Sequence, residues 1–137
     1  MDYGVDLSHW NAVNDARAMR ASGVTFAICK ATDGPSGADA TFAPKVAQLR
    51  AAGIVVGAYH FARAGDPVAQ ARHFAAVAGA AGCLTSGALQ PALDMEDAAV
   101  RGHADSFTTA FVAAVENSGR AGRLGDGRPA VGDHRVR

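Results

Sequence analysis

The feature that most constrains the fold is an alternation of helical patterns and apolar runs, with glycine at the points of change. Val24–Cys29 follows Gly23, and Ile54–Phe61 follows Gly53; both runs are rich in β-branched and aromatic residues. Glycine is favoured just after a helix because it adopts a positive φ without a steric penalty. The pattern therefore predicts helices that end at these glycines and strands that begin directly after them.

Read along the whole chain, the same signals predict four strands alternating with four helices. The predicted strands cover residues 3–8, 24–29, 54–61 and 88–96. Pro91 suggests that the last of these begins after it. The predicted helices cover residues 14–22, 41–52, 67–81 and a segment from about residue 105. Asp66 and Pro67 supply an N-cap and a first-turn proline for the third helix, and Gly82 ends it.

Strands that alternate with helices of this length are typically parallel and joined by right-handed crossovers. Two α/β architectures fit, an open doubly wound sheet and part of a (β/α) barrel, and periodicity does not choose between them. A dinucleotide-binding open sheet would carry G-x-G-x-x-G after its first strand. The corresponding turn here, Ser8–Ala12, contains no glycine, which disfavours that class.

Length and composition exclude several other classes. The 137 residues allow one domain, and no run of 18 to 20 apolar residues suggests a membrane span. The first residues lack the basic and apolar regions of a signal peptide. A formal net charge of zero argues against a nucleic-acid binder held by phosphate contacts. Cys29 and Cys83 are too few for a disulfide scaffold, and neither has zinc-ligand spacing.

The neutral balance is uneven along the chain. Residues 1–117 hold 8 Lys and Arg against 11 Asp and Glu, whereas residues 118–137 hold 5 Arg against 2 Asp, with five glycines. The second segment shows no strand or helix period, so we expect an unstructured Gly/Arg-rich tail over residues 118–137. The folded part is expected to be residues 1–117.

The strongest chemical signal is the pair Asp94 and Glu96. On a strand, residues two apart share a face and lie about 6–7 Å apart. Repulsion between such carboxylates favours a proton on one of them, which gives the acid and the carboxylate that glycoside hydrolysis needs. Asp6, inside the first strand, would lie at the same end of a parallel sheet. The alternative is that Asp94 and Glu96 simply end a strand in a solvated loop.

Other strand-end residues give weaker signals. His9 and Trp10 follow the first strand and fit either a sugar platform or ordinary packing. Residues 30–34 place polar groups, Asp33 among them, after the second strand. Tyr59 ends the third strand facing away from His60, which by itself suggests a structural histidine. Ser8, His9 and Asp6 are serine-hydrolase residue types, but they are adjacent in sequence and no G-x-S-x-G elbow is present.

Taken in order, the strand ends resemble a known family. Its motifs are matched by Gly4–Trp10, Lys30–Gly34, Gly57–Phe61 and Gln90–Glu96. These four segments resemble the glycoside hydrolase family 25 lysozymes, the Chalaropsis-type N-acetylmuramidases. The resemblance covers residues 3 to about 117.

The resemblance implies a TIM-like (β/α) barrel variant, here limited to about the first four β/α units. It implies hydrolysis of the β-1,4 bond between N-acetylmuramic acid and N-acetylglucosamine in peptidoglycan, without a metal or organic cofactor. Glu96 resembles the general acid/base, Asp94 the partner carboxylate and Asp6 the first-strand acid of the same site. Tyr59, Asp33 and His9 match positions that line the glycan groove.

Two departures from the family pattern bear on activity. Asp33 stands where the family usually has Glu, and the aromatic-rich later strands with their further acid do not follow residue 117. We therefore expect a frameshift or truncation near residue 120, and a chain that is weakly stable, prone to associate, and weakly active or inactive. The alternative function is a non-catalytic peptidoglycan-binding remnant. The substrate would place either form outside the cell or at the cell wall, for example by a phage endolysin route.

Overall fold

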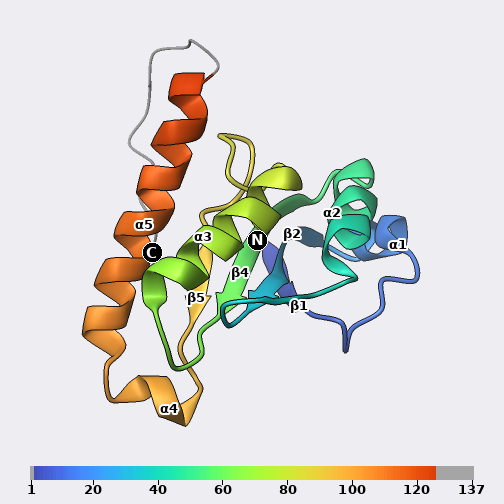
Figure 1. Ribbon diagram of the computed structural model, residues 1–137. Coiled ribbons are helices and arrows are strands. Elements are labelled where there is room, and N and C mark those ends of the chain that lie inside the picture. Colours follow the sequence, from blue (N-terminus) through green and yellow to red (C-terminus); the bar gives the residue numbers. More distant parts are fainter. Residues whose placement is uncertain (1, 126–137) are drawn as a thin grey trace.

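The computed structural model describes residues 2–125, which form a parallel sheet with helices packed on it (Figure 1). The strands are β1 (Tyr3–Leu7), β2 (Val24–Asp33), β3 (Gly37–Ala38), β4 (Val55–Phe61) and β5 (Ala92–Asp94). The helices are α1 (Ala16–Ala21), α2 (Phe42–Ala51), α3 (Pro67–Ala80), α4 (Ala98–Arg101) and α5 (Ala104–Gly125). The predicted alternation is confirmed; β3 and α4 are the two elements that the sequence patterns did not indicate.

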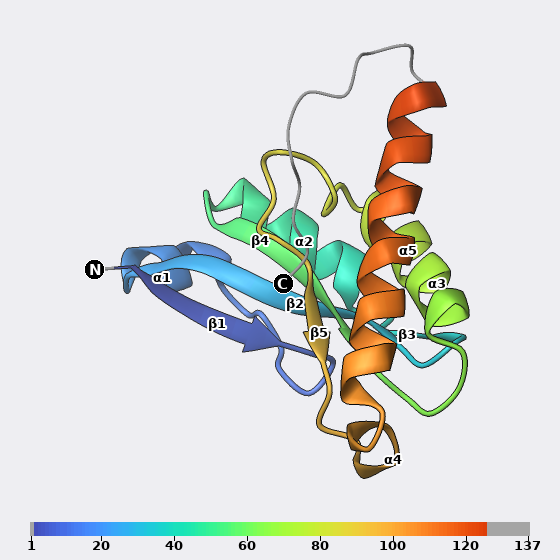
Figure 2. The same ribbon diagram turned by 90° about the vertical axis from the view of Figure 1, so that its left-hand side faces the viewer.

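The four main strands are parallel and lie in the order β1-β2-β4-β5, while β3 forms a short antiparallel pair with the end of β2. The sheet is curled, and Figure 2 shows it from its side with α3 and α5 standing next to each other on one face. Among the described residues, β1 and β5 each pair with one neighbouring strand. The result is a mixed α/β fold whose parallel sheet has the form of half a barrel.

The helix ends follow the local signals in the sequence. The Asp66 carboxylate caps α3 by accepting a hydrogen bond of 2.8 Å from the Val68 amide. Gly23, Gly53 and Gly82 follow α1, α2 and α3 with φ values of 110°, 80° and 73°. These three predicted helix stops therefore require the backbone conformation that glycine adopts most easily.

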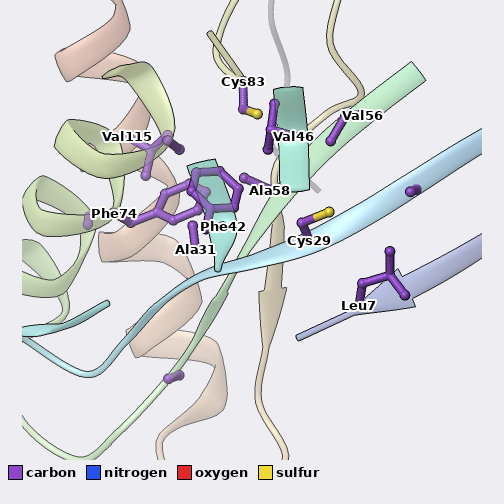
Figure 3. Close-up of a cluster of buried hydrophobic side chains, with 14 of the residues drawn as sticks. Leu7, Cys29, Ala31, Phe42, Val46, Val56, Ala58, Phe74, Cys83 and Val115 are labelled. Carbon is purple, nitrogen blue, oxygen red and sulfur yellow. The ribbon is translucent and has the colours of Figure 1, made fainter. Parts of the chain in front are cut away.

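One face of the sheet forms the hydrophobic core. Alternate residues of β4, namely Val56, Ala58 and His60, are buried, and α2 packs on this strand. The His60 ring lies against Phe74 of α3 and Phe111 of α5. Figure 3 shows Val56 and Ala58 on the same side as Cys29 of β2 and close to the helical side chains. The predicted apolar stripe of α5 is buried there as well, and consists of Phe107, Phe111 and Val115.

The largest boundary differences concern β2, the last strand and the last helix. Strand β2 was expected to end at residue 29 and continues to Asp33. The last strand covers Ala92–Asp94 instead of reaching residue 96, because β4, its partner, ends at Phe61, which pairs with Asp94. Helix α5 continues to Gly125, so residues 118–125 are helical and were wrongly assigned to an unstructured tail. Extending a helix that is already formed costs little per residue, which lets it pass a segment without apolar periodicity.

The rest of the expected tail, residues 126–137, lies outside the described residues. Within residues 2–125, no helix is both long and apolar enough to cross a membrane.

Candidate active site

The face of the sheet opposite the core carries three of the predicted site residues, Asp6, Tyr59 and Asp94. Side chains alternate along each strand, so Tyr59 faces away from buried Ala58 and His60. Asp6 precedes buried Leu7 in β1, and Asp94 follows Leu93, which packs against the core. The pleat therefore directs Asp6, Tyr59 and Asp94 to the same face, although they come from three different strands.

Tyr59 shows that the predicted acids gather at one place. Burial raises the pKa of its hydroxyl to about 12. Nearby negative charges add to the rise, and they belong to Asp6, Asp94, Asp39 and Glu96. A carboxylate disfavours ionisation of a phenol only when the two groups are close. The strand pleat thus places Asp6 and Asp94 on the Tyr59 face of the sheet, and Glu96, two residues after Asp94, is near enough for its charge to act on the same hydroxyl.

Glu96 reaches this place by a route that the strand pattern did not predict. Because β5 ends at Asp94, Glu96 lies beyond the sheet and is exposed. Its amide donates a hydrogen bond of 3.2 Å to Asp94 Oδ1, and its carbonyl accepts one of 2.7 Å from Arg101 Nη2. The assumption that the strand pleat orients both acids was wrong; a turn after the strand orients Glu96.

Asp33 lies at the end of β2, and both of its carboxylate oxygens already have cationic partners. Arg63 Nε is 2.6 Å from Oδ1, Arg63 Nη2 is 3.0 Å from Oδ2, and Lys30 Nζ is 2.9 Å from Oδ2. The hydrogen bonds from Arg63, followed by those from Lys30, hold the pKa of Asp33 at about 2. Although Asp33 is shorter than the Glu usual in the family, its carboxylate makes close contacts with Arg63 and Lys30.

His9 lies in the loop after β1, on the border of the site. Its amide donates a hydrogen bond of 2.7 Å to Asp39 Oδ2, and its Nδ1 is 3.6 Å from the same oxygen. Its ring is 4.4 Å from that of Trp10, which is 82% exposed. Burial alone would raise the pKa of Asp39, but hydrogen bonds from Thr41 and the His9 amide outweigh it and lower that pKa.

The buried polar groups behind the site are hydrogen-bonded. His60 is fully buried, with Thr32 Oγ1 2.6 Å from its Nδ1 and Gln70 Oε1 2.9 Å from its Nε2. The Gln70 oxygen can only accept, so Nε2 carries the proton and Nδ1 accepts from Thr32. Burial lowers the pKa of His60 and keeps the ring neutral. These contacts agree with a structural histidine.

Sequence reasoning missed two charged groups near the acids, Arg63 and Asp97. Arg63 Nη1 is 3.0 Å from Asp97 Oδ2. Their positions in the sequence could have indicated them. Both residues follow the ends of parallel strands, where polar side chains meet at one edge of the sheet. Within residues 2–125, no three His, Cys, Asp or Glu side chains form a group that could hold a metal ion.

Comparisons with known proteins give a consistent result. The model of the family "Glycosyl hydrolases family 25" matches residues 5–122. The chain is 40% identical to Lysozyme M1 of Streptomyces globisporus over 78 residues, which is 56% of this chain and 26% of that protein. It is 35% identical over 71 residues to an autolytic lysozyme of Clostridium acetobutylicum, covering 52% of this chain and 22% of that one.

Solved structures show the same similarity in three dimensions. A bacterial lysozyme from Streptomyces coelicolor aligns with a TM-score of 0.71 and 28% identity, covering 84% of this chain and 57% of that one. A muramidase from Acremonium alcalophilum also aligns with a TM-score of 0.71 and 28% identity, covering 83% and 59%. The chain thus spans about a quarter of the curated relatives and under three-fifths of these structures. On the match over residues 5–122, the chain belongs to glycosyl hydrolase family 25.

Proposed function

We propose that this chain carries the acidic site of an N-acetylmuramidase, a lysozyme that hydrolyses the β-1,4 bond between N-acetylmuramic acid and N-acetylglucosamine in peptidoglycan. The chain would supply about the first four β/α units of a TIM-like barrel. The observation that carries the proposal is that Asp6 and Asp94 share the sheet face of Tyr59, with Glu96 bonded through its amide to Asp94 at the end of β5. Membership of a family whose relatives include lysozymes supplies the substrate class.

Glu96 is the proposed general acid/base. It is exposed at the end of a turn whose backbone is held at both its amide and its carbonyl. An exposed carboxyl on a fixed backbone can reach the glycosidic oxygen of a long glycan and deliver a proton to it. Water then completes the hydrolysis as the leaving sugar departs.

Asp94 and Asp6 are the proposed stabilising carboxylates. Asp94 is half-buried below Glu96, and Asp6 approaches from the other edge strand, β1. Breaking a glycosidic bond develops positive charge on the sugar ring, and fixed negative groups near that ring lower the barrier. A pKa of about 12 keeps the Tyr59 hydroxyl protonated near neutral pH, so it can donate a hydrogen bond to the substrate or to one of these carboxylates.

The glycan would lie across Tyr59 and the loop that carries His9. The exposed indole of Trp10 beside His9 offers an apolar face on which a sugar can pack. Asp33 is a weaker candidate for a direct glycan contact, because Arg63 and Lys30 occupy its oxygens. Action on peptidoglycan would place the protein outside the cell or at the cell wall.

The test is an assay of the 137-residue chain on purified peptidoglycan. We expect a slow release of new reducing ends on N-acetylmuramic acid, in line with the weak activity expected of this chain, and a further loss of about 100-fold or more in Glu96→Gln, since that variant cannot donate the proton. Glu116→Gln makes the same change on α5, away from the acids, and should keep the rate. Equal rates in Glu96→Gln and the wild type would refute the assignment of Glu96.

A second candidate function is glycan binding without hydrolysis. The same purified chain can be used to distinguish it from the muramidase function. The open sheet favours glycan binding, because β1 and β5 each have one partner in the described part of the chain, so the described strands form only part of a barrel wall around the acids. Co-sedimentation with peptidoglycan without any release of reducing ends would support the binding function and refute the muramidase.

A further inference from the structure

Arg63, just after β4, joins two segments that are far apart in sequence. Its Nε and Nη2 contact the two oxygens of Asp33 at 2.6 and 3.0 Å, and its Nη1 contacts Asp97 Oδ2 at 3.0 Å. The planar guanidinium forms two parallel bonds to one carboxylate and has a further N–H group for a second. We call the set Asp33, Arg63 and Asp97 the Arg63 bridge.

The Arg63 end of the bridge is held from inside the protein. Fully buried Gln70 donates from Nε2 to the Arg63 carbonyl at 2.8 Å and accepts from the Arg63 amide at 3.1 Å. The same Gln70 oxygen accepts from His60 in the core. The guanidinium also lies 4.3 Å from the centre of the Phe61 ring. Arg63 therefore has a fixed backbone and a supported side chain.

The other end of the bridge is the residue directly after Glu96. Asp97 is the N-cap of α4: its Oδ1 accepts from the Ala99 amide at 2.9 Å while its Oδ2 contacts Arg63. The Ala99 hydrogen bond, followed by that from Arg63, lowers the pKa of Asp97. The carboxylate is thus ionised near neutral pH and tied on one side to α4 and on the other to β4.

We propose that Arg63 is a positioning residue for Glu96, acting through Asp97. The bridge attaches residues 95–97 to the ends of β2 and β4. These two strands lie between β1, which carries Asp6, and β5, which carries Asp94. It sets where the Glu96 carboxyl lies relative to Asp94 and Asp6 without touching the substrate. The proposal rests on the proposed function, because Glu96 needs to be positioned only if it transfers a proton.

A positioning role and a purely structural role of Arg63 predict different effects on kcat and on thermal stability. The Arg63 side chain is 47% exposed, and exposed ion pairs contribute little to stability. Misplacing a catalytic group by about 1 Å can cost about 100-fold in rate. Removing Arg63 should therefore lower kcat far more than thermal stability, while KM changes little because substrate contacts stay in place.

Three variants separate these effects. Arg63→Ala removes the bridge, and Asp97→Asn keeps an N-cap side chain for α4 but removes the charge that faces Arg63. Arg50→Ala is the matched control: its guanidinium also makes two short contacts, to the carbonyls of Ala81 and Gly82 at 2.7 and 2.8 Å, at the C-terminal end of α3. It removes a structural arginine away from Glu96.

The measurements are kcat and KM on peptidoglycan, the melting temperature, and hydrogen exchange of amides in residues 95–101. For Arg63→Ala we expect kcat to fall about 10- to 100-fold with KM nearly unchanged. Exchange in residues 95–101 should become about tenfold faster, with α2 unaffected. Asp97→Asn should behave similarly, and the double variant should be no worse than the worse single one, since both break one contact.

Two results would overturn the proposal. One is unchanged exchange in residues 95–101 of Arg63→Ala. The other is a loss of kcat in Arg50→Ala equal to that in Arg63→Ala. If the wild-type chain releases no reducing ends, the muramidase proposal fails and Arg63 has no proton transfer to position; the exchange data then show only whether the bridge holds the turn.

Discussion

Replacing Phe111 by alanine should destabilise the fold more than any exposed change on α5. The Phe111 side chain is fully buried where α5 meets the rest of the core. Its ring stacks on His60 at 5.1 Å between centroids, and it lies 5.8 Å from Phe74 and 6.1 Å from Phe107. One side chain therefore links α5 to α3 and to the buried face of β4.

The expected cost is about 3–5 kcal/mol in the free energy of unfolding, because the change removes a buried aromatic ring and leaves a cavity that rigid neighbours fill only in part. Domains of this size are typically stable by about 5–15 kcal/mol, so the loss is a large fraction of the total. In thermal unfolding it corresponds to a fall in the midpoint of about 10–20 °C.

The assay is urea unfolding followed by circular dichroism, with Thr109→Ala as the control. Thr109 is exposed on the same helix, and its hydroxyl donates to the Asp105 carbonyl one turn earlier. We expect the control to change stability by less than about 0.5 kcal/mol. A loss below about 1 kcal/mol in Phe111→Ala would refute the reasoning, since α5 would then not depend on this contact.

Three further predictions concern other parts of the fold. Because the pKa of Asp33 is lowered from 3.8 to about 2, its ionised carboxylate stabilises the fold at pH values above about 3.8. This contribution is lost as the pH falls through about 2. The wild type should therefore lose stability between pH 4 and pH 2, and Asp33→Asn should lose less than the wild type does. The difference should be below about 1 kcal/mol because solvent screens the ion pairs. Urea unfolding at both pH values tests this, and an equal loss of stability in variant and wild type would contradict it. Gly57→Ala places a Cβ 2.7 Å from Leu89 Cβ and should cost about 1–3 kcal/mol in chemical unfolding, whereas Gly87→Ala, with open space around it, should cost little; equal costs would be inconsistent with the contact. Asp66→Ala removes the cap of α3 and should cost about 1 kcal/mol in the same assay, and no change would argue against the cap.

The strand ends show which parts of the site could be predicted. Parallel strands carry their C-terminal residues to one edge, so the grouping of Asp6 with Asp94 and Glu96 follows from the alternation of strands and helices. Where β5 stops could not be read from its own residues. Its pairing ends at Asp94 because β4 ends at Phe61, so the length of the neighbouring strand decides whether Glu96 lies on the sheet.

The partner of Asp33 shows a second limit. The family resemblance predicts that Asp33 lines the glycan groove, but it does not indicate that the carboxylate bonds to Arg63, 30 residues away in sequence. Arg63 in turn reaches Asp97, 34 residues further. Contacts over such separations depend on how strands and loops pack, and no local periodicity indicates them.

The sequence by itself determined the order of strands and helices, the glycine stops, the cap of α3 and the buried stripe of α5. These depend on backbone preferences and side-chain periodicity within a few residues. Only the tertiary structure decided that Glu96 leaves the sheet, that residues 118–125 continue α5, and that Arg63 joins Asp33 to Asp97. The physical reason is that ion pairs and strand ends are set by neighbours in space, which the folded sheet brings together.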